Sequence, residues 1–318
     1  MMLRQRRMIR LLMGLGLGLL LGLMAAAFAT QIHSDQSSMA PGSAASTVHP
    51  LGEKGVEPVK EPPRYEVTQL SHSLIHTVTV SDPQQYPVQI AVGEGLTRVD
   101  ALAQQQGALA ALNAGFFDPN NGLTTSYVTV EGELVADPQQ NQRLVGNPDL
   151  TAYLDQILNR SEFRRYDCGG TVQYDIALHQ AAPPTGCSLV SAVGAGPQLL
   201  PQDTSYEEAF IDYGAEGVIN RDALGSQSRN ARSAIGIKPD GSLVLVMAAQ
   251  RPGISPSGLT FAELTEFLQS VGVEKALNLD GGSSSTLFFQ GTTHYGRLDR
   301  EGNWVRRPVK SIVFIGPG

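Results

Sequence analysis

The sequence predicts an α+β fold, in which a mixed β-sheet core with a few covering helices forms a single domain. Short runs of β-branched residues separated by turn residues recur from residue 65 to the end of the chain. Three amphipathic stretches with helix-start signals interrupt these runs. Two of the three lead through a glycine into a short apolar strand that ends on a polar residue. Strand ends of that kind are where mixed sheets place ligands.

The first 29 residues predict export. An arginine-rich start precedes an apolar stretch from Leu11 to Met24, and Ala27-Phe28-Ala29 offers a cleavage site of the small-x-small type. We expect a signal peptide; the alternative is an uncleaved anchor, because residues 25–29 extend the apolar stretch toward the ~20 residues that span a bilayer. The protein would be periplasmic, in the cell envelope or secreted, with membrane contact only through such an anchor.

Residues 30–64 are rich in Ser, Ala, Pro and charge and lack apolar periodicity, which predicts a disordered linker. The domain is expected over residues 65–318. Without the first 29 residues the chain has 19 basic and 30 acidic residues, a net charge of −11. That charge argues against nucleic acid as a partner, so a phosphate-bearing substrate would need a local cationic group.

The strand pattern contains two hairpins. Residues 127–130 and 134–136 flank a Glu-Gly-Glu turn, and residues 231–238 and 242–249 flank Pro-Asp-Gly. Further strands are expected at residues 73–80, 88–92, 285–289 and 308–315.

The expected helices cover residues 97–106, 148–158 and 260–271. The third begins with a capping box, Thr260-x-x-Glu263, and ends at Gly272. The first begins with Thr97-x-x-Asp100, and the second has Pro148 in its first turn.

Cys168 and Cys187 are an even pair in an exported chain, which favours a disulfide between them over two buried thiols. No metal or cofactor is expected. His72 and His76 share a strand face without a third ligand nearby, and no P-loop, H-E-x-x-H or G-x-S-x-G motif occurs.

The strongest local signal is the run Asn278-Leu279-Asp280-Gly281-Gly282-Ser283-Ser284-Ser285-Thr286. An apolar strand leads into a carboxylate that two glycines and several hydroxyls follow. One interpretation is a solvated turn. The other is a cleft in which Asp280 and the following backbone hold an anion or a sugar, and the strands on both sides favour it.

Five blocks occur in order along the chain: Asn113-Ala114-Gly115-Phe116-Phe117, residues 194–200, Arg232-Ser233-Ala234-Ile235-Gly236, residues 258–264 and residues 278–282. In combination they resemble the phosphodiester glycosidase family, whose members remove a sugar from a sugar-1-phosphodiester. The resemblance covers residues 65 to the end and implies a hydrolase with a carbohydrate or sugar-phosphate substrate. Residues 150–187 contain no family motif and are expected to be an insertion, stapled by the disulfide.

The resemblance carries catalytic roles to Asn113, Arg232 and Asp280, and substrate contacts to Gly115, Gly281, Gly282, Ser283 and Ser284. Ser283 departs from the family pattern, which commonly has a third glycine there. Asp280 would activate water or stabilise a cationic sugar transition state. Arg232 would hold the phosphate through its planar fork, and Asn113 would bond a sugar hydroxyl or the phosphate.

Each role has a structural alternative. Arg232 would otherwise be a surface residue that opens a strand, and Asn113 a capping residue before a glycine turn. Asp118 is a candidate second carboxylate, although Asp118-Pro119-Asn120-Asn121-Gly122 also spells a turn.

Two other functions compete with the enzyme. The domain could bind or assemble envelope polysaccharide without turnover, although pure binding needs no carboxylate beside a phosphate site. Ser283 to Ser285 could supply an esterase or peptidase nucleophile, which the absence of a histidine near the motif blocks makes the weakest interpretation.

Overall fold

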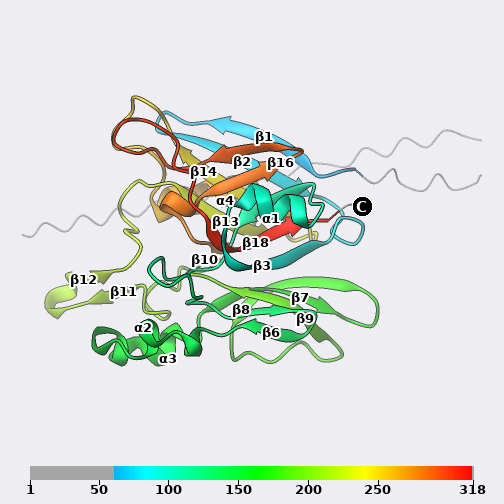
Figure 1. The fold of residues 1–318 in the computed structure, drawn as a ribbon, viewed down its shortest axis with the longest axis horizontal. Coiled ribbons are helices and arrows are strands. Elements are labelled where there is room, and N and C mark those ends of the chain that lie inside the picture. Colours follow the sequence, from blue (N-terminus) through cyan, green and yellow to red (C-terminus); the bar gives the residue numbers. More distant parts are fainter. Residues whose placement is uncertain (1–60, 317–318) are drawn as a thin grey trace, which may run out of the picture. The chain divides into compact units, whose positions relative to one another are not determined.

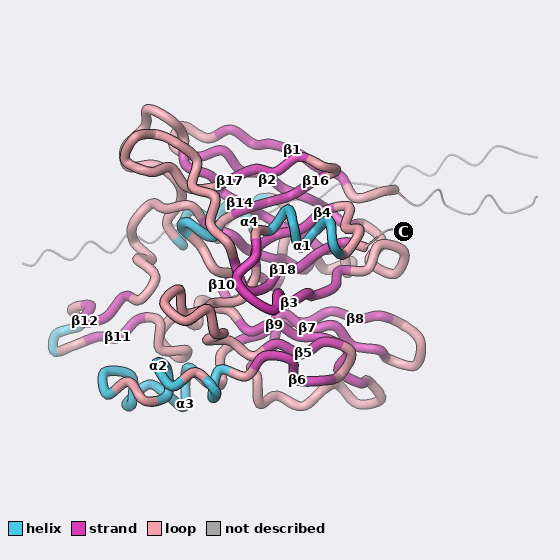
Figure 2. Tube along the Cα trace, viewed as in Figure 1, coloured by secondary structure: helices cyan, strands magenta, loops and turns pink. Residues whose placement is uncertain are grey.

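The computed structural model describes residues 61–316. Figures 1 and 2 show this part as three main β-sheets with short helices. The expected signal peptide and most of the expected linker lie outside the described residues, and the first strand begins at Arg64.

The first sheet is built around a long central hairpin. Its strand order is β1 (Arg64–Gln69), β2 (Ser73–Val80), β14 (Leu243–Gln250), β13 (Arg232–Ile237), β15 (Lys275–Asn278) and β10 (Gln198–Leu200). Helix α4 (Phe261–Ser270) covers one face, where its Leu264 and Leu268 pack with Val244 and Val246 of β14.

The second sheet joins the C-terminal strand to the helix-linked strands of the N-terminal half. Its order is β17 (Thr292–Tyr295), β16 (Thr286–Phe289), β4 (Ala110–Asn113), β18 (Val309–Ile315) and β3 (Val88–Thr97). Helix α1 (Val99–Gln105) covers one face, where Leu102 packs in a cluster with Ala111 and Phe314.

The third sheet comes from the middle of the chain. Its order is β6 (Glu133–Ala136), β5 (Val128–Val130), β9 (Ser188–Gly194), β7 (Ser161–Asp167) and β8 (Val172–Leu178). The short helices α2 (Gln142–Val145) and α3 (Leu154–Ile157) lie between β6 and β7 in the chain. A separate hairpin follows, formed by β11 (Ile211–Tyr213) and β12 (Ile219–Asp222).

One apolar core connects the three sheets. Leu245 of β14, Val313 of β18 and Phe163 of β7 are fully buried in it. Helices α4 and α1 belong to two separate clusters that involve the alternate side chains of the first and second sheets. The first two sheets therefore pack face to face, each with a helix on its outer face, as the period of two along a strand requires.

The expected mixed sheet is wrong, because every strand pairing within residues 61–316 is antiparallel. Helix α1 does join two strands of the same direction, β3 and β4, and α4 likewise joins β14 and β15. In each case a third strand, β18 or β13, lies between them and pairs antiparallel with both. The helix–strand pattern says nothing about this inserted strand.

Most expected elements are present with shifted ends. The Thr260–Glu263 capping box is confirmed, as is the left-handed Gly272 after α4. Helix α1 instead starts after Arg98, without a side-chain cap. The stretch at 148–158 is a 3₁₀ helix (Pro148–Tyr153) that leads into α3.

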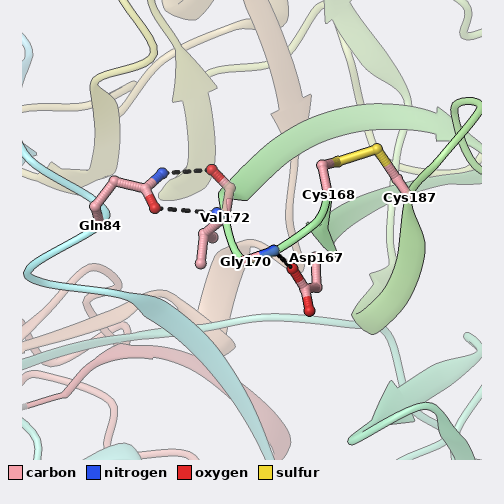
Figure 3. The surroundings of a disulfide bond; sticks show 6 residues. All are labelled: Gln84, Asp167, Cys168, Gly170, Val172 and Cys187. Carbon is pink, nitrogen blue, oxygen red and sulfur yellow. Dashed lines mark hydrogen bonds between the residues drawn. A yellow bond between two sulfur atoms is a disulfide. The ribbon is translucent and has the colours of Figure 1, made fainter.

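Cys168 and Cys187 form the expected disulfide (Figure 3). It ties the turn between β7 and β8 to the segment just before β9. Gln84 fixes the same turn, because its side chain bonds both the N–H and the carbonyl of Val172. The region expected to be an insertion thus supplies two strands, β7 and β8, and β7 lies inside the third sheet.

Within residues 61–316, none of the helices combines the length and apolar character that crossing a bilayer requires.

Candidate active site

Asp280 lies where the first sheet meets the second. After β15 the chain crosses between the sheets: the Leu279 N–H donates to the Ser233 carbonyl of β13 at 2.8 Å. The next amide, that of Asp280, donates to the Ala114 carbonyl just beyond β4 at 2.9 Å. Backbone bonds to both sheets therefore fix the position of the carboxylate.

The two glycines after Asp280 permit a tight turn against β13. A side chain at Gly281 would place its Cβ 3.1 Å from the Ala231 carbonyl oxygen, and Gly282 has a φ of +60°. A single 3₁₀ turn (Gly282–Ser284) follows and brings the Ser284 hydroxyl to the Asp280 carboxylate. The glycines thus allow the hydroxyl-rich run to fold back over the carboxylate.

Asn113 ends β4 and is fully buried. Its Nδ2 donates to the backbone carbonyl of Asp280 at 2.5 Å, while its Oδ1 accepts from Ser233 Oγ at 2.8 Å and from the Thr286 N–H at 3.0 Å. Asn113 therefore joins both sheets beneath Asp280, and its side chain bonds backbone groups and a hydroxyl rather than the Asp280 carboxylate.

Arg232 begins β13 and turns its guanidinium toward the preceding loop. Nε donates to the Leu259 carbonyl at 3.0 Å, and the terminal nitrogens donate to the carbonyls of Leu224, Gly225 and Ser228 at 2.6–3.0 Å. The residue is 3% exposed, and burial lowers the pKa of its guanidinium to about 10. Arg232 thus uses four of its five N–H donors, three of them to hold residues 224–228 in place and one to hold Leu259.

These elements enclose a pocket of about 220 Å³. Asp280 is the one carboxylate among its lining residues. They are Ala223, Leu224, Asn230, Arg232, Asn278, Leu279, Asp280, Gly281, Gly282, Ser283 and Arg297.

Two further arginines bring positive charge to the site. Arg297 lines the pocket and donates to Asn230 Oδ1 at 3.3 Å. Arg307 donates to Ser283 Oγ at 2.9 Å, and its charge acts on the Asp280 carboxylate. Neither guanidinium forms a salt bridge within the described part of the chain. Both are therefore available to an anion.

Burial raises the pKa of Asp280 to about 6. Ser284, Arg307 and the Gly281 N–H act in the opposite direction because they favour the charged form. The carboxylate consequently changes its protonation state near neutral pH, as general acids and bases of enzymes do.

Asn278 offers an unused acceptor at the same place. Its Nδ2 donates to the Gly196 carbonyl at 2.8 Å, which fixes the orientation of the amide. Its Oδ1 is buried and has no hydrogen-bond partner among the described residues, although Asn278 lines the pocket. A ligand hydroxyl that donates to Oδ1 would remove the cost of this unpaired acceptor.

The remaining predicted residues occupy different positions. Gly115 does not line the pocket; its Cβ would lie 2.8 Å from the Gly194 carbonyl oxygen, so a glycine there permits close packing against β9. Asp118 accepts from Arg143 Nε at 2.6 Å and from the Asn120 N–H, within a turn outside the pocket.

Asn230, Arg297 and Arg307 lie outside the five motif blocks and were not predicted from the sequence. One signal was available, because residues 297–307 contain four arginines in an acidic chain. Such clustering indicates an anion-binding surface.

A larger hollow of about 710 Å³ lies on other residues, among them Tyr127, His179 and Glu207. His179 stacks on Tyr127 there and bonds the buried Glu162 at 2.6 Å. This hollow is larger but shares no lining residue with the Asp280 pocket, where the carboxylate and the arginines lie.

A carboxylate that faces arginines at the junction of two sheets suits a polar, anionic substrate. The family model of phosphodiester glycosidases matches residues 106–316, so the chain belongs to the phosphodiester glycosidase family.

Solved structures support the same fold. The catalytic domain of zebrafish N-acetylglucosamine-1-phosphodiester alpha-N-acetylglucosaminidase, auto-inhibited by its pro-peptide, is 17% identical with a TM-score of 0.58, over 80% of this chain and 83% of that one. A hypothetical protein from Synechocystis is 19% identical with a TM-score of 0.52, over 80% of this chain and 61% of that one. No curated protein matches the sequence. At these identities the likeness to solved structures concerns the fold.

Proposed function

We propose that this protein hydrolyses the glycosyl–phosphate bond of a sugar-1-phosphodiester in envelope or extracellular glycans. Family membership supports the reaction class. The observation that carries the proposal is the Asp280 carboxylate, held at the sheet junction with a pKa of about 6 and flanked by Arg297 and Arg307.

The reaction breaks the bond between the anomeric carbon and the bridging phosphate oxygen. The phosphate leaves with the bonding electron pair as a phosphomonoester, water adds its hydroxyl to the anomeric carbon, and one proton is released. Asp280 is largely ionised above pH 6, where it stabilises the cationic sugar transition state or takes the proton of the attacking water. Arg297 and Arg307 stabilise the charge on the departing phosphate.

A phosphate is already a good leaving group and needs charge stabilisation more than protonation. The pocket accordingly functions with one carboxylate among its lining residues, where most glycoside hydrolases use two. Ser283 and the glycine turn form the anion side of the pocket, and Asn278 Oδ1 accepts from a sugar hydroxyl.

Arg232 and Asn113 are positioning residues in this scheme. Arg232 holds the loop that forms one wall of the pocket, and Asn113 holds the backbone of Asp280. Arg297 and Arg307 therefore take the phosphate-binding role that the family resemblance implies for Arg232.

We further propose that the protein is exported, in the periplasm, the cell envelope or the medium. The Cys168–Cys187 disulfide supports an oxidising compartment. N-terminal sequencing of protein from the producing cells should return a start near residue 30, whereas a start at Met1 would indicate an anchor.

The enzyme and a non-catalytic polysaccharide-binding protein differ in turnover. The purified protein is incubated with a panel of sugar-1-phosphodiesters that vary in sugar and in anomeric configuration. Free sugar and phosphomonoester should appear in equal amounts, and Asp280→Asn should abolish most of both. Saturable binding with no product from any panel member would instead favour the binding protein.

A further inference from the structure

A second hollow of about 530 Å³ adjoins the Asp280 pocket. Neighbouring residues of two segments line the two hollows. Arg229 lines the second hollow and Asn230 the Asp280 pocket; Leu298 lines the second hollow and Arg297 the Asp280 pocket. A 3.3 Å hydrogen bond between Arg297 and Asn230 holds the two segments together on the side of the Asp280 pocket. The two hollows therefore lie on neighbouring residues of the same two segments.

The second hollow lies between two loops, residues 250–257 and 298–302, which Figure 1 shows side by side near the top left of the molecule. The Leu298 N–H donates to Gln250 Oε1 at 2.9 Å, and the Gln250 N–H donates to the Gly296 carbonyl at 2.7 Å. The loops are thus fixed to each other and to the strands that carry the site.

Two arginines of the second hollow have no acidic partner among residues 61–316. Arg251 is oriented by two bonds from Nη1, to the carbonyls of Leu70 and Ser71 at 2.8 and 3.0 Å, while Nε and Nη2 have no hydrogen-bond partner within residues 61–316. Arg300 is exposed at the rim. Carbonyl bonds orient a guanidinium without neutralising it, so Arg251 remains a positioned cation.

The lining residues carry two other charges: Arg229, which is paired, and Asp299, which stays ionised and offsets one of the two free arginines. Arg229 forms three short contacts with the Glu263 carboxylate. Asp299, the one carboxylate among the lining residues, accepts from the N–H groups of Glu301 and Asn303, and these bonds lower its pKa. Arg251 and Arg300, in an acidic chain, thus leave this hollow with positive charge that an anion can use.

We infer that the second hollow is a subsite for a further phosphate group on the aglycone, beyond the phosphate that is cleaved. The inference rests on the proposed function and narrows its substrate to phosphodiesters with a phosphorylated aglycone. The planar forks of Arg251 and Arg300 suit phosphate oxygens. The acidic remainder of the chain disfavours the same anion elsewhere on the surface.

The test compares two substrates with the same sugar, one with glycerol and one with glycerol phosphate as the aglycone. The wild-type protein should show a kcat/KM about tenfold higher for the phosphorylated aglycone at low salt, and this preference should shrink as ionic strength rises. Arg251→Gln and Arg300→Gln should each remove most of the preference. Arg306→Gln is the matched control, since Arg306 is exposed on the same segment, stacks on Tyr295 and does not line the hollow.

The outcomes separate the two proposals. Equal kcat/KM values for the two substrates would overturn the subsite and leave the glycosidase intact. A preference for the phosphorylated aglycone that survives in both Arg251→Gln and Arg300→Gln would do the same. If no member of the substrate panel is cleaved, the glycosidase fails and calorimetry with glycerol bisphosphate decides on the subsite. Binding that weakens about tenfold in the Arg251→Gln, Arg300→Gln double variant supports it, and equal binding rejects it.

Discussion

Asp280 combines two requirements that act against each other. Burial disfavours its charge, while Ser284, Arg307 and the Gly281 N–H favour it, and the net effect is a pKa of about 6. A carboxylate with an ordinary pKa would be ionised but weakly basic. Raising the pKa makes the ionised form a stronger base at neutral pH.

Asp280→Asn keeps the size of the side chain and removes its charge, so turnover should fall by at least ~10²-fold. In the wild-type protein, kcat should decline as pH drops through about 6, because protonated Asp280 can neither stabilise a cation nor accept a proton. The measurement is kcat between pH 4.5 and 8 for both proteins. The wild-type values should fit the titration curve of a single ionisable group. Asp240→Asn, in the turn between β13 and β14, is the control and should leave the profile unchanged.

The Asp280→Asn variant should be more stable than the wild-type protein at neutral pH. The folded carboxyl group binds its proton more tightly than the unfolded one, with a pKa of about 6 against 3.8. Its contribution to stability is therefore fully present below the unfolded pKa and is lost as pH rises through the folded pKa. Asp280→Asn avoids this loss, so its Tm should exceed that of the wild type at pH 7.5 and approach it near pH 4. A variant that is less stable than the wild type at pH 7.5 would show that burial does not oppose the charge.

Arg232 and Arg297 should respond differently to substitution. Arg232→Lys cannot reach four carbonyls with one ammonium group, so its Tm should fall and its kcat/KM should drop for every substrate alike. Arg297→Gln should leave Tm near the wild-type value, because Arg297 makes a single exposed hydrogen bond, to Asn230. It should slow the hydrolysis of phosphodiesters more than that of an uncharged aryl glycoside. If Arg232→Lys slowed phosphodiesters selectively and Arg297→Gln did not, Arg232 would be the residue that binds the phosphate.

At the scale of elements, two helix–glycine–strand units deliver the site. The unit formed by α1 and β4 ends at Asn113, and the unit formed by α4 and β15 ends at Asn278. This pattern was visible in the sequence because helix caps, glycines and apolar strands are local signals. The strands β13 and β18 were also expected from the sequence, but their insertion between the linked strands was not, because long-range pairing has no local signature.

The disulfide is an element-scale constraint on the turn between β7 and β8. It closes a separation of 19 residues, so the Cys168→Ser, Cys187→Ser double variant should lose about 3 kcal/mol by the loop-entropy estimate. No residue of β7, β8 or their connecting turn lines the Asp280 pocket, so kcat should change less than about threefold if ~0.6 kcal/mol of coupling is allowed. Urea unfolding and the hydrolysis assay measure the two effects. A loss of activity without a loss of stability would contradict this separation.

At the scale of the whole molecule, the site forms only when the first and second sheets meet. Asn113, Arg232 and Asp280 were predicted from motif blocks, and the structure brings all three to the junction. Their bonding could not be predicted, because the carbonyls that occupy Arg232 belong to a loop with no regular pattern. Arg297 and Arg307 reach the site on the connection between β17 and β18, and only the folded chain reveals their position there.

The central claim is that the protein breaks the bond at the anomeric carbon and not the bond at phosphorus. Hydrolysis of a sugar-1-phosphodiester in ¹⁸O-labelled water distinguishes the two by mass spectrometry of the products. A quench that is fast relative to sugar ring-opening keeps the label in place. We predict that the label appears in the sugar at C1 and that the phosphomonoester remains unlabelled. Label in the phosphomonoester would show attack at phosphorus, and the protein would then be a phosphodiesterase rather than a glycosidase.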